Sequence, residues 1–313
     1  MIVKNINSVS LGTTNISISK IGLGTWAWGD TTVWSYGKGY TDDDIQEAFT
    51  VSINNGVNFL DTAEIYGRGT SEKLIGNLLK AINTDIVIAS KFMPFPWRLT
   101  KGSLRKALIR SLKRLQLESV DVYQTHWPFP PVPVRTWMDA MADVVEDGLV
   151  RAVGVSNYSK AQMFRAYDQL AKRNIPLASN QVEYSLLKRS PETSGLLNSC
   201  KELGITLIAY SPLTMGLLTG KYSPDNPPPG IRGRRYRGNK LVRIEKLNGL
   251  LREIGQTRGG KSPAQVALNW LLAKGTVPIP GAKNAEQAKQ NAGALGWILS
   301  DEEVALLDRE SQK

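Results

Sequence analysis

Four side chains in the first half of the chain supply an acid, a phenol, an ammonium group and an imidazole. Asp61, Lys91 and His126 stand at or just past short apolar runs, and Tyr66 follows Asp61 by five residues. A tyrosine hydroxyl has an ordinary pKa near 10, and a nearby ammonium group lowers this pKa because it favours the phenolate. We therefore expect Lys91 to make Tyr66 a better proton donor, with Asp61 holding Lys91 charged and in place.

Such a set of groups is suited to the reduction of a carbonyl group. Tyr66 would give a proton to the developing alkoxide, and His126 would donate a hydrogen bond to the same oxygen. The hydride must come from a bound cofactor, because no side chain can deliver one. Each of the four residues taken alone has an ordinary structural explanation, so the prediction depends on their coming together.

The sequence also predicts the scaffold that would bring them together. Amphipathic segments end at Gly56, Gly148, Gly204 and Gly275, and each is followed by a short apolar run. Glycine often ends a helix in the left-handed conformation, and such a run is typical of a strand buried on both faces. Strands are expected at residues 21–24, 58–60, 86–90, 120–124, 150–155, 178–182, 206–210 and 277–279. Helices are expected at residues 42–54, 71–81, 103–115, 135–146, 160–173, 192–203, 241–255, 263–273 and 285–295.

Eight alternating strands and helices predict an α/β fold, the (β/α)8 or TIM barrel, rather than an open sheet. Catalytic groups of such a barrel lie at the carboxyl ends of its strands, where the four residues above are placed. Residues 8–11 and 16–18 flank a Gly-Thr-Thr-Asn turn, which indicates an N-terminal β-hairpin that caps the barrel floor. No linker or internal repeat is visible, so residues 1–313 are expected to form a single domain.

The composition excludes several classes of protein. One cysteine, Cys200, and one histidine cannot form a zinc site of three or four nitrogen and sulfur ligands, an iron–sulfur cluster or an intrachain disulfide, and we expect no metal. No apolar run reaches the roughly 18 residues of a membrane span, and residues 1–7 are too polar for a signal peptide. We expect a soluble, cytoplasmic protein without a membrane partner.

The net charge of +11 is concentrated in one stretch of the chain. Residues 221–243 carry seven Lys and Arg but one Asp, and they include Pro227-Pro228-Pro229-Gly230, which predicts a long loop after the seventh strand. A basic loop of this kind guides a phosphorylated molecule or nucleic acid, or it is simply solvated. In the barrel we expect it to close as a strap over a cofactor, with no nucleic-acid partner.

Two segments match phosphate-binding patterns, but their neighbouring elements do not suit phosphate binding. Residues 255–262 fit the P-loop pattern letter for letter, but they follow apolar residues at helical spacing instead of a strand. Residues 22–27 fit the dinucleotide-binding fingerprint, but a polar segment follows them where a helix is needed. We therefore expect neither nucleotide hydrolysis nor a Rossmann domain.

Seven short motifs in order along the chain resemble the successive signatures of the aldo-keto reductase family. They are DTAEIYG at 61–67, ASKF at 89–92, THWP at 125–128, VGVSNY at 153–158, NQVEY at 180–184, AYSPL at 209–213 and IPGAK at 279–283. The resemblance runs from about residue 11 to about residue 295 and is strongest to the branch of plant plastids and cyanobacteria. It implies a TIM barrel that uses NADP(H) without a Rossmann domain.

The resemblance also implies roles for individual residues. It makes Asp61, Tyr66, Lys91 and His126 a catalytic tetrad. The cofactor-binding residues that it implies are Gly24, Thr25 and Trp26 near the nicotinamide ribose, Ser156, Asn157 and Gln181 at the nicotinamide amide, Tyr210 against the nicotinamide ring, Ser211, Leu213 and Gly216 along the pyrophosphate, and Gly281, Lys283, Gln287 and Asn291 at the adenosine end. Gln290 stands where many members have a glutamate, so the adenine contact departs from the family pattern.

The expected function is NADPH-dependent reduction of aldehydes or ketones, with a small-molecule carbonyl substrate. Aromatic side chains in or beside the loops after strands one, three and four predict an aromatic substrate pocket. They are Trp26, Trp28, Trp34, Phe92, Trp97 and Trp127. The alternative is an NADP(H)-binding regulatory protein with little turnover, like the potassium-channel β subunits of the same family. We expect a monomer or weak oligomer, and a location in the plastid stroma is open if a transit peptide has been removed.

Overall fold

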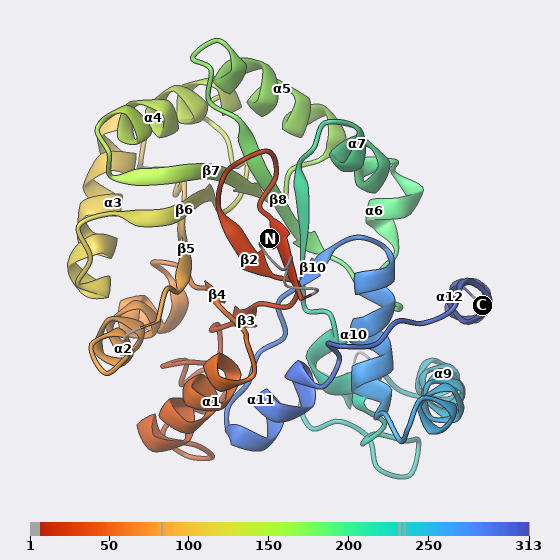
Figure 1. The fold of residues 1–313 in the computed structure, drawn as a ribbon. Helices are drawn as coiled ribbons and strands as arrows, with labels where there is room; N and C mark the ends of the chain where they lie inside the picture. The colour runs from red at the N-terminus through yellow and green to blue at the C-terminus, as the bar shows by residue number, and fades with distance from the viewer. Residues whose placement is uncertain (1–6, 83, 231–232, 235, 313) are drawn as a thin grey trace, which may run out of the picture.

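The computed structural model describes residues 7–82, 84–230, 233–234 and 236–312, and its centre is a sheet of eight parallel strands (Figure 1). The strands pair in the order of the chain. They are β3 (Leu23–Gly24), β4 (Phe59–Asp61), β5 (Val87–Phe92), β6 (Val120–Thr125), β7 (Val150–Ser156), β8 (Leu177–Glu183), β9 (Thr206–Tyr210) and β10 (Val277–Pro278). Each overlaps one of the eight strands predicted from the apolar runs.

Backbone hydrogen bonds between the first and the last strand segments close the sheet. Gly22 N donates to Pro278 O at 2.9 Å, Gly24 N donates to Pro280 O at 3.0 Å, and Gly24 forms a parallel bridge with Gly281. A Cβ at Gly24 would lie 2.7 Å from Ile279 O, so the closure requires glycine there. The predicted (β/α)8 barrel is confirmed.

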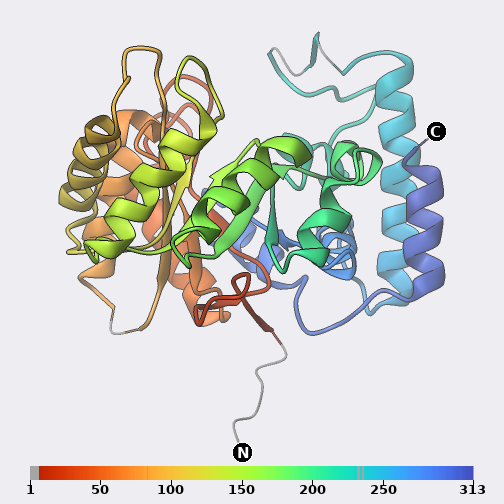
Figure 2. The ribbon, with the colours of Figure 1, turned by 90° about the horizontal axis from the view of Figure 1, so that it is seen from above.

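The predicted hairpin covers the barrel floor, on the side opposite the carboxyl ends of the strands (Figure 2). Strand β1 (Ser8–Ser10) pairs antiparallel with β2 (Ser17–Ser19). Leu11 and Ile18 are fully buried and pack in one cluster with inward-facing residues of the barrel strands, such as Phe59. Apolar contact with the barrel interior therefore holds the hairpin in place.

Helices surround the sheet, and most follow the predicted ranges. They are α1 (Asp42–Asn54), α2 (Thr70–Leu79), α3 (Lys101–Leu115), α4 (Val134–Glu146), α5 (Lys160–Ala171), α6 (Ser190–Thr193), α7 (Leu196–Glu202), α9 (Asn239–Thr257), α10 (Pro263–Ala273), α11 (Ala285–Ala292) and α12 (Asp301–Glu310). The helix predicted at 192–203 is wrong as one unit, because Gly195 with φ of +73° separates α6 from α7. The P-loop-like residues 255–262 join α9 to α10, which agrees with their rejection as a phosphate loop.

Helix α12 was not predicted, although its start has a local signal. Ser300 Oγ accepts a hydrogen bond from Glu303 N, and Glu303 Oε2 accepts one from Ser300 N at 2.7 Å. This reciprocal pair is a capping box, which satisfies two backbone donors at the first turn of a helix. Helix α12 lies beside α9 (Figure 2). Arg258, the residue directly after α9, forms an ion pair with Glu303 of α12, with 2.6 Å between Nη2 and Oε2.

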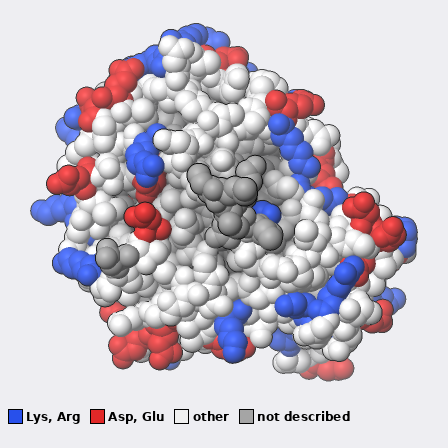
Figure 3. All heavy atoms as spheres, viewed as in Figure 1, with Lys and Arg blue, Asp and Glu red and all other residues white. Residues whose placement is uncertain are grey.

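Charged side chains of both signs lie on the hairpin face, without a dominant sign (Figure 3). Figure 3 shows most Lys, Arg, Asp and Glu of this face toward its outer edge, over the helices. None of the described helices is long and apolar enough to cross a bilayer. Among the same described residues no cluster of three His, Cys, Asp or Glu is placed to hold a metal ion.

Helices α2 and α3 pack so closely that Gly76 leaves no room for a side chain. A Cβ there would lie 2.7 Å from the carbonyl oxygens of Arg114 and Leu115. We expect Gly76→Ala to lower the free energy of unfolding by about 1–3 kcal/mol, because the helices must separate. The matched control is Gly249→Ala in α9, where nothing lies within 4 Å of the added methyl group.

In the control the better helix propensity of alanine should raise the free energy of unfolding by up to about 1 kcal/mol. Urea denaturation followed by circular dichroism measures both variants. Equal changes for Gly76→Ala and Gly249→Ala would contradict the tight contact between α2 and α3.

Candidate active site

The carboxyl ends of three neighbouring strands bring the predicted acid, ammonium and imidazole groups together. Asp61 ends β4, Lys91 is the fifth residue of β5, and His126 follows β6. Lys91 Nζ donates to Asp61 Oδ1 at 2.5 Å and to the Tyr66 hydroxyl at 3.3 Å. A third hydrogen bond, to Thr62 O at 2.8 Å, fixes the ammonium group in the wall of the barrel.

Tyr66 reaches this group because the chain turns back directly after it. Tyr66 opens the 3-10 segment Tyr66–Gly69, in which Gly67, Arg68 and Gly69 have φ values of 53°, 56° and 92°. Glycine adopts this left-handed region without steric cost, and a Cβ at Gly67 would lie 2.6 Å from Gly29 O. The two glycines in DTAEIYGRG therefore hold Tyr66 over the end of β4.

Burial decides the protonation behaviour of Tyr66 and Lys91. Burial raises the pKa of the Tyr66 hydroxyl, and the charge of Lys91 offsets only part of this, so the pKa stays above its ordinary value. The predicted lowering of the Tyr66 pKa is therefore wrong for the protein alone. Burial alone would lower the pKa of Lys91, but Asp61 and Tyr66 raise it above its ordinary value, so Lys91 is charged.

His126 is neutral at pH 7. Burial, followed by the positive charge of Lys91, lowers the pKa of the imidazole well below its ordinary value. Its ring lies edge to face with the Tyr66 ring, with 5.8 Å between the centroids. His126 Nδ1 is buried and has no hydrogen-bond partner among the described residues.

The second oxygen of Asp61 accepts two side-chain amides. Gln181 Nε2 donates to Asp61 Oδ2 at 2.7 Å, and Gln124 Nε2 donates to the same oxygen at 3.2 Å. Gln124 is not among the predicted site residues, although an amide near the carboxyl end of the predicted strand at 120–124 is a signal for it. Gly154 makes room for it, since a Cβ there would lie 2.8 Å from Gln124 Cγ.

The predicted nicotinamide-binding residues form a second cluster at the same end of the barrel. Asn157, with φ of +63°, donates from Nδ2 to His126 O and to Ser156 Oγ, both at 3.0 Å. Its Oδ1 accepts a hydrogen bond from the Tyr210 hydroxyl at 2.9 Å. Gln181 belongs to this group by register with Ser156, yet its amide nitrogen is directed to Asp61.

The predicted adenosine-end residues gather beyond β10. Asn291 Nδ2 donates to Gly281 O at 3.2 Å, and Lys283 N donates to Gln287 Oε1 at 3.0 Å. Lys283 Nζ lies 4.6 Å from the ring centroids of both Trp34 and Tyr40. Gln290, the departure from the family pattern, donates to Glu286 Oε1.

The remaining predicted cofactor residues lie around the same rim, with one side chain turned away. Thr25 is fully buried, and its hydroxyl donates to Asp61 O at 2.9 Å and contacts Ser71 Oγ at 2.8 Å, so it binds the barrel wall. Trp26 is 38% exposed beside Tyr66, with 6.5 Å between the ring centroids. Gly24 takes part in the barrel closure described above. The residues Ser211, Leu213 and Gly216 follow β9.

The predicted basic strap is only partly described. Arg232 and Arg235 lie outside the described residues. The segment between β9 and α9 leaves the barrel on the side opposite the hairpin, which is the side of the active site (Figure 2). The predicted strap therefore lies on the same side of the barrel as the active site. Its closing over a cofactor stays a prediction.

Aromatic rings follow the carboxyl ends of β3, β5 and β6 as predicted, but two of the predicted rings do not belong to an open pocket. Trp28 and Phe92 are fully buried, since Trp28 Nε1 donates to Ala282 O at 2.9 Å and Phe92 packs on Trp137 in the core. The other rings, which are exposed or half-buried, form pairs. Phe95 stacks on Trp97 with 4.7 Å between centroids, Trp127 stacks on Phe129 with 5.4 Å, and Trp26 meets Trp34 edge to face at 5.5 Å.

The lowered pKa of His126 gives a pH dependence with a definite sign. The histidine of the unfolded chain binds a proton near pH 6.5, whereas the folded chain binds it only at lower pH, so the free energy of unfolding falls as the pH drops below about 6.5. His126 is the only histidine, so one imidazole resonance reports it. NMR titration should give a midpoint well below 6.5 in the folded protein and near 6.5 in urea; a folded midpoint at or above 6.5 would contradict the burial.

Comparison with known proteins agrees with this geometry. The model of the aldo/keto reductase family matches residues 20–311. The chloroplastic pyridoxal reductase of Arabidopsis thaliana is 43% identical over 314 residues, which cover 95% of this chain and 85% of the relative. A thermostable aldo-keto reductase in complex with epalrestat is 35% identical with a TM-score of 0.79, covering 97% of this chain and 99% of that one. An aldo-keto reductase from Klebsiella pneumoniae in complex with NADPH is 28% identical with a TM-score of 0.76, covering 97% and 95%. The chain thus belongs to the aldo/keto reductase family.

Proposed function

We propose that this protein reduces an aromatic aldehyde to an alcohol, with Asp61, Tyr66, Lys91 and His126 as its catalytic residues. Family membership makes the chain an NADP(H)-dependent oxidoreductase that acts on carbonyl groups. One observation carries the assignment of residues: Lys91 Nζ bridges the Asp61 carboxylate and the Tyr66 hydroxyl at 2.5 and 3.3 Å. The whole chain is proposed to act as a single domain.

In the proposed reaction Tyr66 is the proton donor. Lys91 next to its hydroxyl stabilises the phenolate that forms when the proton leaves, and Asp61 keeps Lys91 charged. His126, neutral at pH 7, orients the carbonyl oxygen by a hydrogen bond. NADPH, when bound, supplies the hydride.

The residues at the barrel rim fit this cofactor chemically. Asn157 and Ser156 offer amide and hydroxyl groups beside His126, and the half-buried ring of Tyr210 offers an aromatic face for the nicotinamide. Lys283 offers a cation for a phosphate near the start of α11. We propose that these residues hold NADPH, together with Gly24, Thr25, Trp26, Gln181, Ser211, Leu213, Gly216, Gly281, Gln287 and Asn291.

Two observations support an aromatic aldehyde as the substrate. Exposed rings such as Trp26, Trp97 and Trp127 follow the strand ends that carry the site, and such rings suit a flat, apolar molecule. The relative from Arabidopsis thaliana is a pyridoxal reductase, and pyridoxal is an aromatic aldehyde, so it is the first substrate to try. No observation favours the alternative of a regulatory protein with little turnover.

The assembly and the location complete the proposal. We propose a monomer or weak oligomer, which analytical ultracentrifugation of the NADPH-bound protein would measure. The proposed location is the cytoplasm, with the plastid stroma as the second choice because the relative from Arabidopsis thaliana is chloroplastic.

Tyr66→Phe tests the proton donor. The variant keeps the ring but loses the hydroxyl, so kcat for 4-nitrobenzaldehyde or pyridoxal should fall by two or more decades, which is about 3 kcal/mol of transition-state stabilisation. The affinity for NADPH, measured by quenching of tryptophan fluorescence, should stay unchanged. Tyr167→Phe on α5 is the control and should retain full kcat. An unchanged kcat in Tyr66→Phe would remove Tyr66 from the mechanism, and no turnover of any aldehyde or ketone by the unaltered protein would overturn the enzyme itself.

Lys283→Met tests the cofactor preference. NADPH carries a 2′-phosphate that NADH lacks, so the unaltered protein should bind NADPH at least tenfold more tightly, a difference of about 1.4 kcal/mol. Lys283→Met should remove most of this difference, while Lys289→Met, later in α11, should leave it in place. Neutralising Arg234, one of the described arginines of the strap, should mainly slow the association of NADPH. Equal affinities of the unaltered protein for NADPH and NADH would show that Lys283 is not the phosphate ligand.

A further inference from the structure

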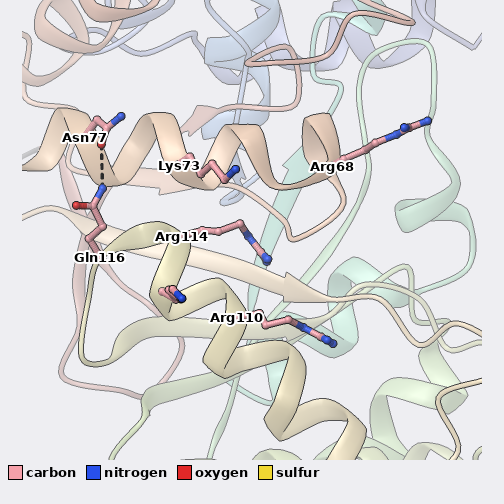
Figure 4. A pocket seen from close by; sticks show the side chains of 7 residues that line it. Arg68, Lys73, Asn77, Arg110, Arg114 and Gln116 are labelled. Carbon is pink, nitrogen blue, oxygen red and sulfur yellow. Dashed lines mark hydrogen bonds between the residues drawn. The ribbon is translucent and has the colours of Figure 1, made fainter.

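A basic hollow lies on the flank of the barrel, between the outer faces of α2 and α3 (Figure 4). It is open to solvent and has a volume of about 540 Å³, and its lining contains five cations and two amides but no acid. The lining residues are Arg68, Lys73, Asn77, Arg110, Lys113, Arg114 and Gln116. We propose that this hollow binds a small phosphorylated molecule, separately from the cofactor and substrate sites at the strand ends.

The close packing of two helices creates the hollow. Figure 4 shows Lys73 and Asn77 on α2 facing Arg110 and Arg114 on α3. The backbones approach because position 76 between them is glycine, so the longer side chains on either side form the walls. Gln116 Nε2 donates to Asn77 Oδ1 at 2.9 Å and joins the two helices at one end of the hollow.

One of the five cations is fixed and already neutralised. Arg114 Nε donates to Glu72 Oε2 at 2.6 Å, and Arg114 Nη2 donates to Ser111 Oγ at 3.1 Å. Glu72 is fully buried, and its other oxygen accepts a hydrogen bond from Ser90 Oγ at 2.6 Å. Arg114 therefore gives the hollow a rigid wall, held from inside the protein.

The other four cations have no acidic partner in the described part of the chain. Arg68, Lys73, Arg110 and Lys113 form no ion pair there, and they surround one hollow. These like charges repel one another. An anion bound between them would be attracted to each cation and would offset this repulsion. A phosphate group suits the task, because guanidinium groups bind its oxygens in pairs and ammonium groups bind it as point charges.

On the opposite flank of α3 the cations do form ion pairs, so the absence of acidic partners is specific to the side of the hollow. Lys101 lies 3.5 Å from Asp143, and Arg105 forms an ion pair with Asp147, both on the side of α4. Toward α4 these two cations of α3 meet carboxylates of the chain itself. Toward α2 the one carboxylate that binds a cation of α3 is the buried Glu72, which holds Arg114, and the lining offers none to the other four cations. This is the arrangement expected where an external anion provides the negative charge.

The shape of the hollow favours a small ligand over a nucleic acid. The cations line one hollow of limited extent, which suits a molecule with one or two phosphate groups. A duplex presents a charge about every 1.7 Å along its axis and is bound by cations spread along an extended surface. The ligand class is therefore a phosphate ester or a diphosphate.

The test is calorimetric titration of the protein saturated with NADPH, so that the phosphate sites at the barrel mouth are filled. Inorganic pyrophosphate and fructose 1,6-bisphosphate are the probes, with ionic strength held constant by NaCl. We expect saturable binding of one molecule with a Kd below about 1 mM. Arg110→Ala together with Lys113→Ala should weaken the binding at least tenfold.

The matched control is Lys101→Ala together with Arg105→Ala, which removes the same charge from the other flank of α3. It should change the Kd less than twofold, and both double variants should keep the circular dichroism spectrum of the unaltered protein because all four side chains are exposed. No saturable heat, or equal weakening in both double variants, overturns the proposal. Tighter binding of a double-stranded oligonucleotide than of pyrophosphate at the hollow also overturns it and assigns the surface to nucleic acid. None of these readouts depends on catalytic turnover.

Discussion

The buried ion pair between Lys91 and Asp61 is the interaction on which the rest of the site depends. The two side chains are 0% and 2% exposed, and removing each charge from water costs several kcal/mol. Hydrogen bonds offset this cost: Thr62 O accepts from the ammonium group, and Gln124 and Gln181 donate to the carboxylate. The ion pair and its partners come from four different strands or strand ends, β4, β5, β6 and β8, so only the closed barrel provides them together.

The elements of the barrel were predictable because their signals are local. A glycine at a helix end followed by an apolar run occurs four times in the chain, and eight apolar runs that alternate with amphipathic segments are enough to indicate a closed barrel. The break at Gly195 and the capping box of α12 at Ser300 are local too, and a closer reading of those residues would have found both. The side-chain direction of Gln124 was not predictable, because it depends on the register of β6 within the barrel.

The depth at which side chains are buried could not be predicted from the sequence, and it decides the pKa of Tyr66 and the exposure of the tryptophans. Two opposed effects act on the pKa of Tyr66, and which one prevails depends on the depth of its hydroxyl, which no spacing of residues reveals. In the same way Trp28 and Trp97 both follow strand ends, but Trp28 is fully buried and Trp97 is 72% exposed. Trp28 is buried because a carbonyl oxygen from the far end of the chain accepts its indole N–H.

The chain order separates the two tasks of the proposed reaction. The proton-transfer groups all come from residues 61–126, and most of the proposed cofactor contacts come from residues 156–291. The hydrogen bonds from Asn157 to His126 O and from Gln181 to Asp61 link the two parts. Nucleotide preference and acid–base chemistry can therefore change independently in evolution or by design, provided that these two amide side chains are retained.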